Sequence, residues 1–102
     1  ITIARSKLMQ LTRDQSELYK NKFTPVLRND KIQGFKLIYV PENNFLFELG
    51  ARSGDIIRRI NGQPMDNTSK MIEFYQSIQT ADRVTVDVER GGKIVPYEII
   101  VN

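Results

Sequence analysis

The sequence predicts an α+β fold, in which a small partial β-barrel of five to six short strands is capped by two helices and carries an N-terminal helical extension. Three observations predict it: short β-prone runs recur, turn residues separate them, and two segments have helical periodicity. A chain of 102 residues suffices for one core but not for two. We therefore expect a helical extension at residues 1–22, packed on one domain at residues 23–102.

The N-terminal extension has the pattern of an amphipathic helix. An apolar stripe recurs at spacings of three and seven through Leu8, Leu11 and Leu18. Thr12 and Gln15 match a capping box, so residues 6–21 form either one helix or two helices that meet near Thr12. In both cases we expect the stripe to pack on the domain.

The middle of the chain predicts a strand, a turn and a second strand, which are Val26–Arg28, Asn29–Lys31 and Gln33–Val40. The second strand is rich in β-branched and aromatic residues, and it stops at Pro41 because proline cannot donate to the ladder. Asn43 or Asn44 then caps a short helix over residues 45–49, which Gly50 ends.

The rest of the chain predicts a strand, a longer helix and a hairpin. The strand covers residues 56–60 and runs into an Asn61-Gly62 turn. The helix begins at residues 66–68 and collects Met71, Phe74 and Ile78 on one face. Residues 84–89 and 94–101 then pair across Gly91-Gly92, with Pro96 at a bulge or at the edge of the sheet.

Residues 50–62 resemble the signature of PDZ domains. Bacterial members carry a glycine, a hydrophobic residue, a short polar turn that ends in Gly-Asp, two aliphatic residues and then Asn-Gly. Here the sequence is Gly-Ala-Arg-Ser-Gly-Asp-Ile-Ile-Arg-Arg-Ile-Asn-Gly. The predicted elements on both sides follow the order found in PDZ domains, so the resemblance covers residues 25–101 and implies a PDZ-like partial barrel.

The flanks are similar to the C-terminal periplasmic domain of general secretion pathway protein C, an inner-membrane component of bacterial type II secretion. The similar features are the N-terminal helix and the segments Pro25–Leu27, Gly34–Phe35, Val40–Pro41, Phe45–Phe47 and Val88–Gly92. PDZ domains of periplasmic serine proteases share the central signature and are the alternative. The resemblance implies a periplasmic domain of an inner-membrane protein, anchored by a transmembrane helix that this sequence does not contain.

The resemblance also implies a protein-binding function. A partner segment would add as a strand beside the second strand and pack against the long helix. In this family the PDZ domain is expected to recruit or select secreted proteins, or to bind other secretion-system components. A structural role remains open, in which the domain braces the secretion complex or supports a homodimer of the full-length protein.

The groove that the resemblance implies has a strand side and a helix side. The strand side comprises Gln33, Gly34, Phe35, Leu37 and Tyr39, and the helix side comprises Thr68, Ile72 and either Tyr75 or Gln76. Phe35, Leu37 and Ile72 have an alternative place in the core. Arg28 or Lys31 would complement a terminal carboxylate. Because Ile32 and Gln33 depart from the family's Gly-Φ-Gly-Φ loop, an internal segment is the alternative to a free C-terminus.

Composition argues against other classes of function. The chain has no histidine and no cysteine, so the usual catalytic bases, thiol nucleophiles and zinc sites are missing. We therefore expect no enzyme activity, no metal and no cofactor. Residues 1–36 hold eight Lys or Arg against three Asp or Glu. The scattered placement disfavours nucleic acid and indicates solvated helix faces, with an acidic partner or lipid surface as the alternative.

Overall fold

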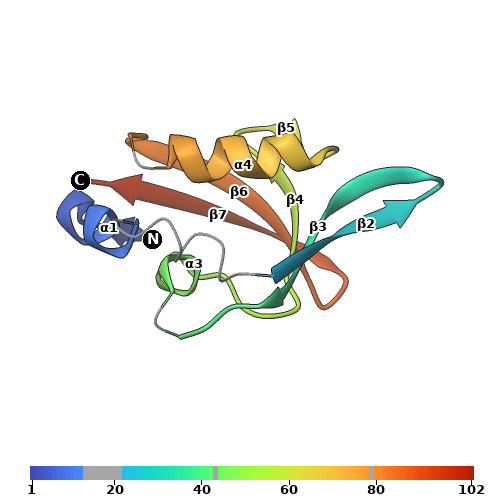
Figure 1. The fold of residues 1–102 in the computed structure, drawn as a ribbon, viewed down its shortest axis with the longest axis horizontal. Helices are drawn as coiled ribbons and strands as arrows, with labels where there is room; N and C mark the ends of the chain where they lie inside the picture. Colours follow the sequence, from blue (N-terminus) through green and yellow to red (C-terminus); the bar gives the residue numbers. More distant parts are fainter. Residues whose placement is uncertain (13–21, 43, 79) are drawn as a thin grey trace.

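The computed structural model describes residues 1–12, 22–42, 44–78 and 80–102, and within them it contains an open mixed sheet of seven strands with three helices (Figure 1). The strands are β1 (Thr2–Ile3), β2 (Lys22–Arg28), β3 (Lys31–Tyr39), β4 (Ile56–Ile60), β5 (Gln63–Pro64), β6 (Arg83–Arg90) and β7 (Lys93–Val101). The helices are α1 (Arg5–Thr12), α3 (Phe45–Glu48) and α4 (Thr68–Ser77).

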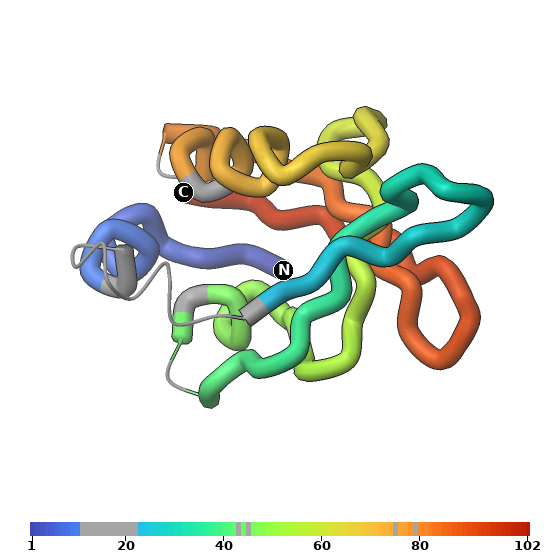
Figure 2. The backbone as a smooth tube through the Cα atoms, turned by 45° about the vertical axis from the view of Figure 1, so that its right-hand side comes forward, coloured from blue at the N-terminus to red at the C-terminus, as the bar shows by residue number. Residues whose placement is uncertain are grey.

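The strand order of the sheet is β1-β7-β6-β4-β3-β2, and β5 pairs with β4 beside this path. All pairs are antiparallel except β1 with β7, which is parallel. Helices α4 and α3 lie on opposite sides of the long β6–β7 hairpin, as both views show (Figures 1 and 2). This is the predicted α+β fold, a PDZ-like partial barrel.

The core lies between the sheet and α4. Helix α4 contributes Met71, Phe74 and Ile78, the face that the periodicity predicts, and all three are buried. Strand β6 contributes its alternating valines, and β3 contributes Phe35 and Leu37. Burial of these apolar side chains is the main stabilising term, because the chain has no disulfide.

Polar residues define the ends of the elements at the predicted places. The Asn44 side chain accepts a hydrogen bond from the Leu46 amide at 2.9 Å, at the start of α3. Asn67 accepts from the Lys70 amide at 3.1 Å and caps α4. Asn29 and Asp30 adopt φ angles of 53° and 62°, which closes the β2–β3 hairpin with a two-residue turn of the kind that matches strand twist.

Several details differ from the sequence-based expectation. Strands β1 and β5 were not predicted, since two-residue strands carry no periodic signal. Strand β2 begins at Lys22 instead of Val26, because Phe23 already packs against the core. Pro96 lies in β7 opposite Asp87, away from the short pairing with β1, so it occupies an edge as expected.

The N-terminal extension is described only in part. Helix α1 covers Arg5–Thr12, and Leu8 is buried against the core. The predicted continuation to residue 21, with Leu18, Gln15 and the proposed break, lies outside the described residues. The division of the chain at residue 22 stays a prediction.

Candidate functional site

The strand expected to receive a partner, β3, has neighbours on both of its edges. Strand β2 pairs with one edge from Lys22 to Arg28. On the other edge, Phe35 and Lys36 pair with β4, and the Leu37 amide donates to the Asp55 carbonyl at 2.7 Å. The Leu37 carbonyl in turn accepts from the Gly54 amide at 2.6 Å. The prediction of an open edge along β3 is therefore wrong.

The open edge belongs to β2, which ends the sheet on this side. No strand among the described residues pairs with its outer side. Strand β2 also contains Pro25, a residue that sheets tolerate at edges because it cannot donate to a ladder. Pro25 is the sequence signal that identifies the correct edge. Leu27, with 66% of its surface exposed, leaves apolar area on this strand uncovered.

Two of the predicted strand-side residues are core residues instead. Phe35 and Leu37 are 0% exposed, so the alternative interpretation as core holds for both. The Phe35 ring meets the Phe23 ring edge-on, with centroids 5.6 Å apart, and this contact joins β3 to the inner face of β2. Both residues therefore stabilise the β2–β3 hairpin from within the core, and neither is accessible to a partner.

The other strand-side residues lie at separate places. Gly34 is buried at a register shift of the hairpin, and Gln33 accepts a long hydrogen bond from Arg58 at 3.4 Å. Tyr39 is exposed at the far end of β3. The structure therefore does not bring Gln33 and Tyr39 together into one pocket.

The helix-side residues form a polar and apolar outer surface on α4. Thr68, Ile72 and Gln76 are exposed, and they recur at spacings of four along the helix. Ile72 keeps 44% of its surface in solvent. The side chain of Tyr75, the alternative to Gln76, lies outside the described part. Figures 1 and 2 both show α4 above β2, with the β2–β3 turn extending beyond the start of α4.

The two predicted carboxylate contacts differ in their availability. Arg28 binds both oxygens of Glu89, with Nη1–Oε1 at 3.2 Å and Nη2–Oε2 at 2.9 Å. Glu89 also accepts from Arg58 at 2.6 Å. The hydrogen bond from Arg28 is the largest cause that lowers the pKa of Glu89, with Arg58 adding to it. Arg28 is thus already paired with Glu89. Lys31, in contrast, is exposed and has no ion pair within the described residues.

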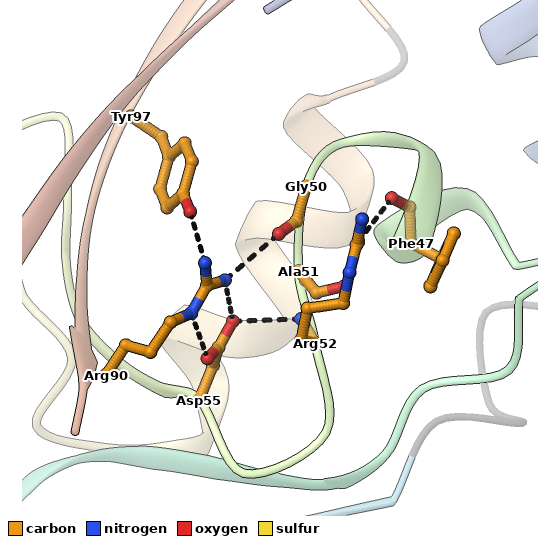
Figure 3. Close-up of polar contacts among 7 residues, drawn as sticks. All are labelled: Phe47, Gly50, Ala51, Arg52, Asp55, Arg90 and Tyr97. Carbon is orange, nitrogen blue, oxygen red and sulfur yellow. Dashed lines mark hydrogen bonds and ion pairs between the residues drawn. The ribbon is translucent and has the colours of Figure 1, made fainter.

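The signature loop is held by an ion pair that the sequence analysis did not assign (Figure 3). Asp55 is buried and binds the guanidinium of Arg90, which also donates to the Tyr97 hydroxyl at 2.7 Å. Arg52 lies over the Phe47 ring, 3.8 Å from its centroid. These contacts fix the loop whose Gly54 and Asp55 pair with β3, and so they position the hairpin that carries the open edge.

The described residues contain no cluster of three or more side chains suited to hold a metal ion. Among the helices in the described ranges, none has the length and hydrophobicity needed to cross a membrane.

Comparison with known proteins gives two curated relatives, and no family model matches the sequence. The chain is 25% identical over 73 residues to the serine protease Do-like HtrA of Lactobacillus helveticus, which is 72% of this chain and 18% of that protein. It is 22% identical over 71 residues to type II secretion system protein C of Dickeya dadantii, which is 70% of this chain and 26% of that protein. The chain thus spans about a fifth to a quarter of the length of these relatives.

Solved structures of PDZ domains are similar to this chain. The PDZ domain of EpsC from Vibrio cholerae superposes with a TM-score of 0.62 at 24% identity, covering 93% of this chain and 91% of that one. The PDZ domain of the pullulanase C protein of the Klebsiella pneumoniae type II secretion system, solved with a fatty acid, gives 0.52 at 20% identity over 91% and 98%. The HtrA3 PDZ domain with the phage-derived ligand FGRWV gives 0.59 at 21% identity over 78% and 79%. This chain therefore has the PDZ fold and resembles the PDZ domains of type II secretion protein C.

Proposed function

We propose that this chain is a protein-binding PDZ module of a type II secretion system inner-membrane component. In this role it recruits or selects secreted proteins in the periplasm. The similarity to EpsC extends over 93% of the chain, whereas the similarity to the HtrA3 domain covers 78%. This wider coverage favours the secretion component over the alternative, a PDZ domain of a periplasmic serine protease.

The observation that carries the proposal is the unpaired outer edge of β2 beside α4. A strand edge presents N–H and C=O groups that another extended chain can pair with, and this backbone pairing supplies affinity. Leu27 on β2 and Ile72 on α4 leave apolar surface exposed on the two elements. A partner strand that pairs with β2 would cover both side chains, which gives the binding a hydrophobic contribution.

The helix residues set the preference for the partner's side chains. Thr68 stands at the start of α4, where this family often sets ligand preference. Threonine replaces the histidine with which some PDZ domains hold a ligand hydroxyl, so apolar partner side chains are the expectation beside Thr68, Ile72 and Gln76. An internal segment and a free C-terminus remain the two forms of ligand to compare.

Chemical-shift mapping with an apolar heptapeptide tests the proposal. We expect amide shifts at residues 23–27 and 68–76, and a matched peptide with N-methylated alternate amides should lose them because it cannot pair as a strand. Capping the peptide's carboxylate as an amide then separates a C-terminal ligand from an internal one.

Shifts confined to residues 5–12, or none at all, would contradict the groove and support the structural role. In that case sedimentation of the full-length protein would test the homodimer.

A further inference from the structure

A hollow of about 490 Å³ lies at the turn end of the β2–β3 hairpin. It forms because β3 pairs with β4 only at Phe35 and Lys36, while β5 pairs with β4 at Arg59 and Ile60. Since β6 occupies the other edge of β4, β3 and β5 share one edge and leave a notch between them. Its walls are Lys31, Ile32 and Gln33 from β3, Arg58 and Arg59 from β4, and residues 64–66.

The charge in this notch is predominantly positive. Lys31 and Arg59 are exposed, and neither forms an ion pair within the described residues. Arg58 donates to Glu89 at 2.6 Å and to Gln33 at 3.4 Å. The notch's carboxylate, Asp66, is held by Lys70 at 3.0 Å, so its charge is compensated from α4.

The notch lies next to the proposed groove. Its residues Lys31 and Ile32 pair directly with Arg28 and Leu27 of β2, so the notch is one strand away from the open edge. At its other wall, Asp66 precedes the first residue of α4 by two positions. The notch therefore lies between the end of β2 and the beginning of α4.

We propose that this notch binds acidic side chains of the partner segment, so that the domain selects an apolar stretch flanked by Asp or Glu. The inference rests on the proposed function and adds the partner's chemistry to it. A strand added to the outer edge of β2 reaches the notch when its chain continues past Arg28 and bends across the β2–β3 turn, because β2 and β3 lie between that edge and the notch. Lys31 and Arg59, which form no ion pair within the described residues, then meet the carboxylates of the partner.

The expected effect of each contact is modest. An exposed ion pair changes affinity by about 1.5- to 5-fold, so Lys31 and Arg59 together give roughly 2- to 25-fold. The effect weakens with salt, since the screening length falls to about 10 Å at 0.1 M.

Two ¹⁵N shift titrations test the inference. The first uses capped tetraglutamate and capped tetraglutamine alone. Tetraglutamate should shift the amides of residues 31–33 and 58–59, and tetraglutamine should not. The second uses the apolar heptapeptide extended by Glu-Glu-Glu or by Gln-Gln-Gln at its N-terminus. The glutamate form should bind roughly 2- to 25-fold more tightly at low salt.

Two exposed substitutions, Lys31→Gln combined with Arg59→Gln, should abolish this preference. Lys7→Gln is the control for the loss of a positive charge, because α1 lies at the opposite end of the molecule from the hairpin (Figure 1). It should leave the preference in place.

Absence of tetraglutamate shifts at the notch, equal shifts with both tetrapeptides, or a loss of preference in Lys7→Gln would each overturn the inference. If the notch responds while the apolar peptide leaves residues 23–27 and 68–76 unshifted, the groove fails and the anion site stands. The two proposals are thereby separated.

Discussion

The Arg90 guanidinium donates hydrogen bonds to both carboxylate oxygens of Asp55, with Nε–Oδ1 at 2.8 Å and Nη2–Oδ2 at 2.6 Å (Figure 3). The same guanidinium donates to the Gly50 carbonyl at 3.1 Å, and Asp55 accepts from the Arg52 amide at 2.9 Å. The hydrogen bond to Asp55 raises the pKa of Arg90 above its ordinary value. One carboxylate thus joins the signature loop to the end of β6.

Asp55→Asn should destabilise the domain by about 2–3 kcal/mol, because the half-buried Arg90 loses the countercharge that the buried Asp55 supplies, and one acceptor becomes a donor. The measurement is urea unfolding at pH 7. Glu98→Gln is the matched control: Glu98 pairs with Arg83 on the exposed surface, where such a pair contributes about 0–1 kcal/mol. Equal losses in the two variants would show that the Asp55 pair does not stabilise the fold.

Glu89 should make the stability of the domain depend on acid pH. Hydrogen bonds from Arg28 and Arg58 lower its pKa below the ordinary 4.5. A carboxyl with a lower pKa in the folded state contributes fully above its unfolded pKa, and the contribution is lost as the pH falls through the folded value. Unfolding free energy measured from pH 6 to pH 3 should therefore fall less steeply in Glu89→Gln than in the parent protein. Parallel curves would contradict this origin of the acid sensitivity.

Gly34→Ala should be more damaging than an alanine at another positive-φ glycine. Gly34 has φ +142°, and a Cβ there would meet the Ile57 carbonyl oxygen at 2.6 Å. Backbone strain and the clash together should cost about 2–4 kcal/mol. Gly62→Ala is the control, since Gly62 has φ +79° but nothing within 4 Å of the added carbon. Thermal unfolding measures the loss of stability in the two variants. Similar losses would mean that β3 moves away from β4 enough to accommodate the added carbon.

The sequence predicts the elements of this fold better than their pairing. Asn61-Gly62, Gly91-Gly92 and the face formed by Met71, Phe74 and Ile78 are local signals, and each predicted its turn or helix correctly. Which strand lies at the edge depends instead on contacts between distant residues, so an apolar run such as β3 fits either an edge or a paired position. A proline inside β2 was the local sign of the edge.

Local sequence signals also could not predict the ion pairs. Asp55 and Arg90 are 35 residues apart, and Arg28 and Glu89 are 61 apart. Arg28 looked available to a ligand because the sequence does not show that Glu89 faces it. Periodicity did predict that Thr68, Ile72 and Gln76 lie on the exposed face of the helix. It does not show which other element lies next to that face.

Leu27→Ser and Ile72→Ser should each weaken binding of the apolar heptapeptide while leaving the fold intact. Both residues lie at the surface, at 66% and 44% exposure, so their truncation opens no enclosed cavity. Covering the exposed part of such a side chain is worth roughly 1 kcal/mol, or about fivefold in affinity. Met9→Ser serves as the control, because Met9 is 58% exposed on α1, at the opposite end of the molecule from the β2–β3 hairpin (Figure 1). Titration calorimetry on the three variants measures the effect. If Met9→Ser weakens binding as much as the other two, or if neither Leu27→Ser nor Ile72→Ser does, the partner does not lie between β2 and α4.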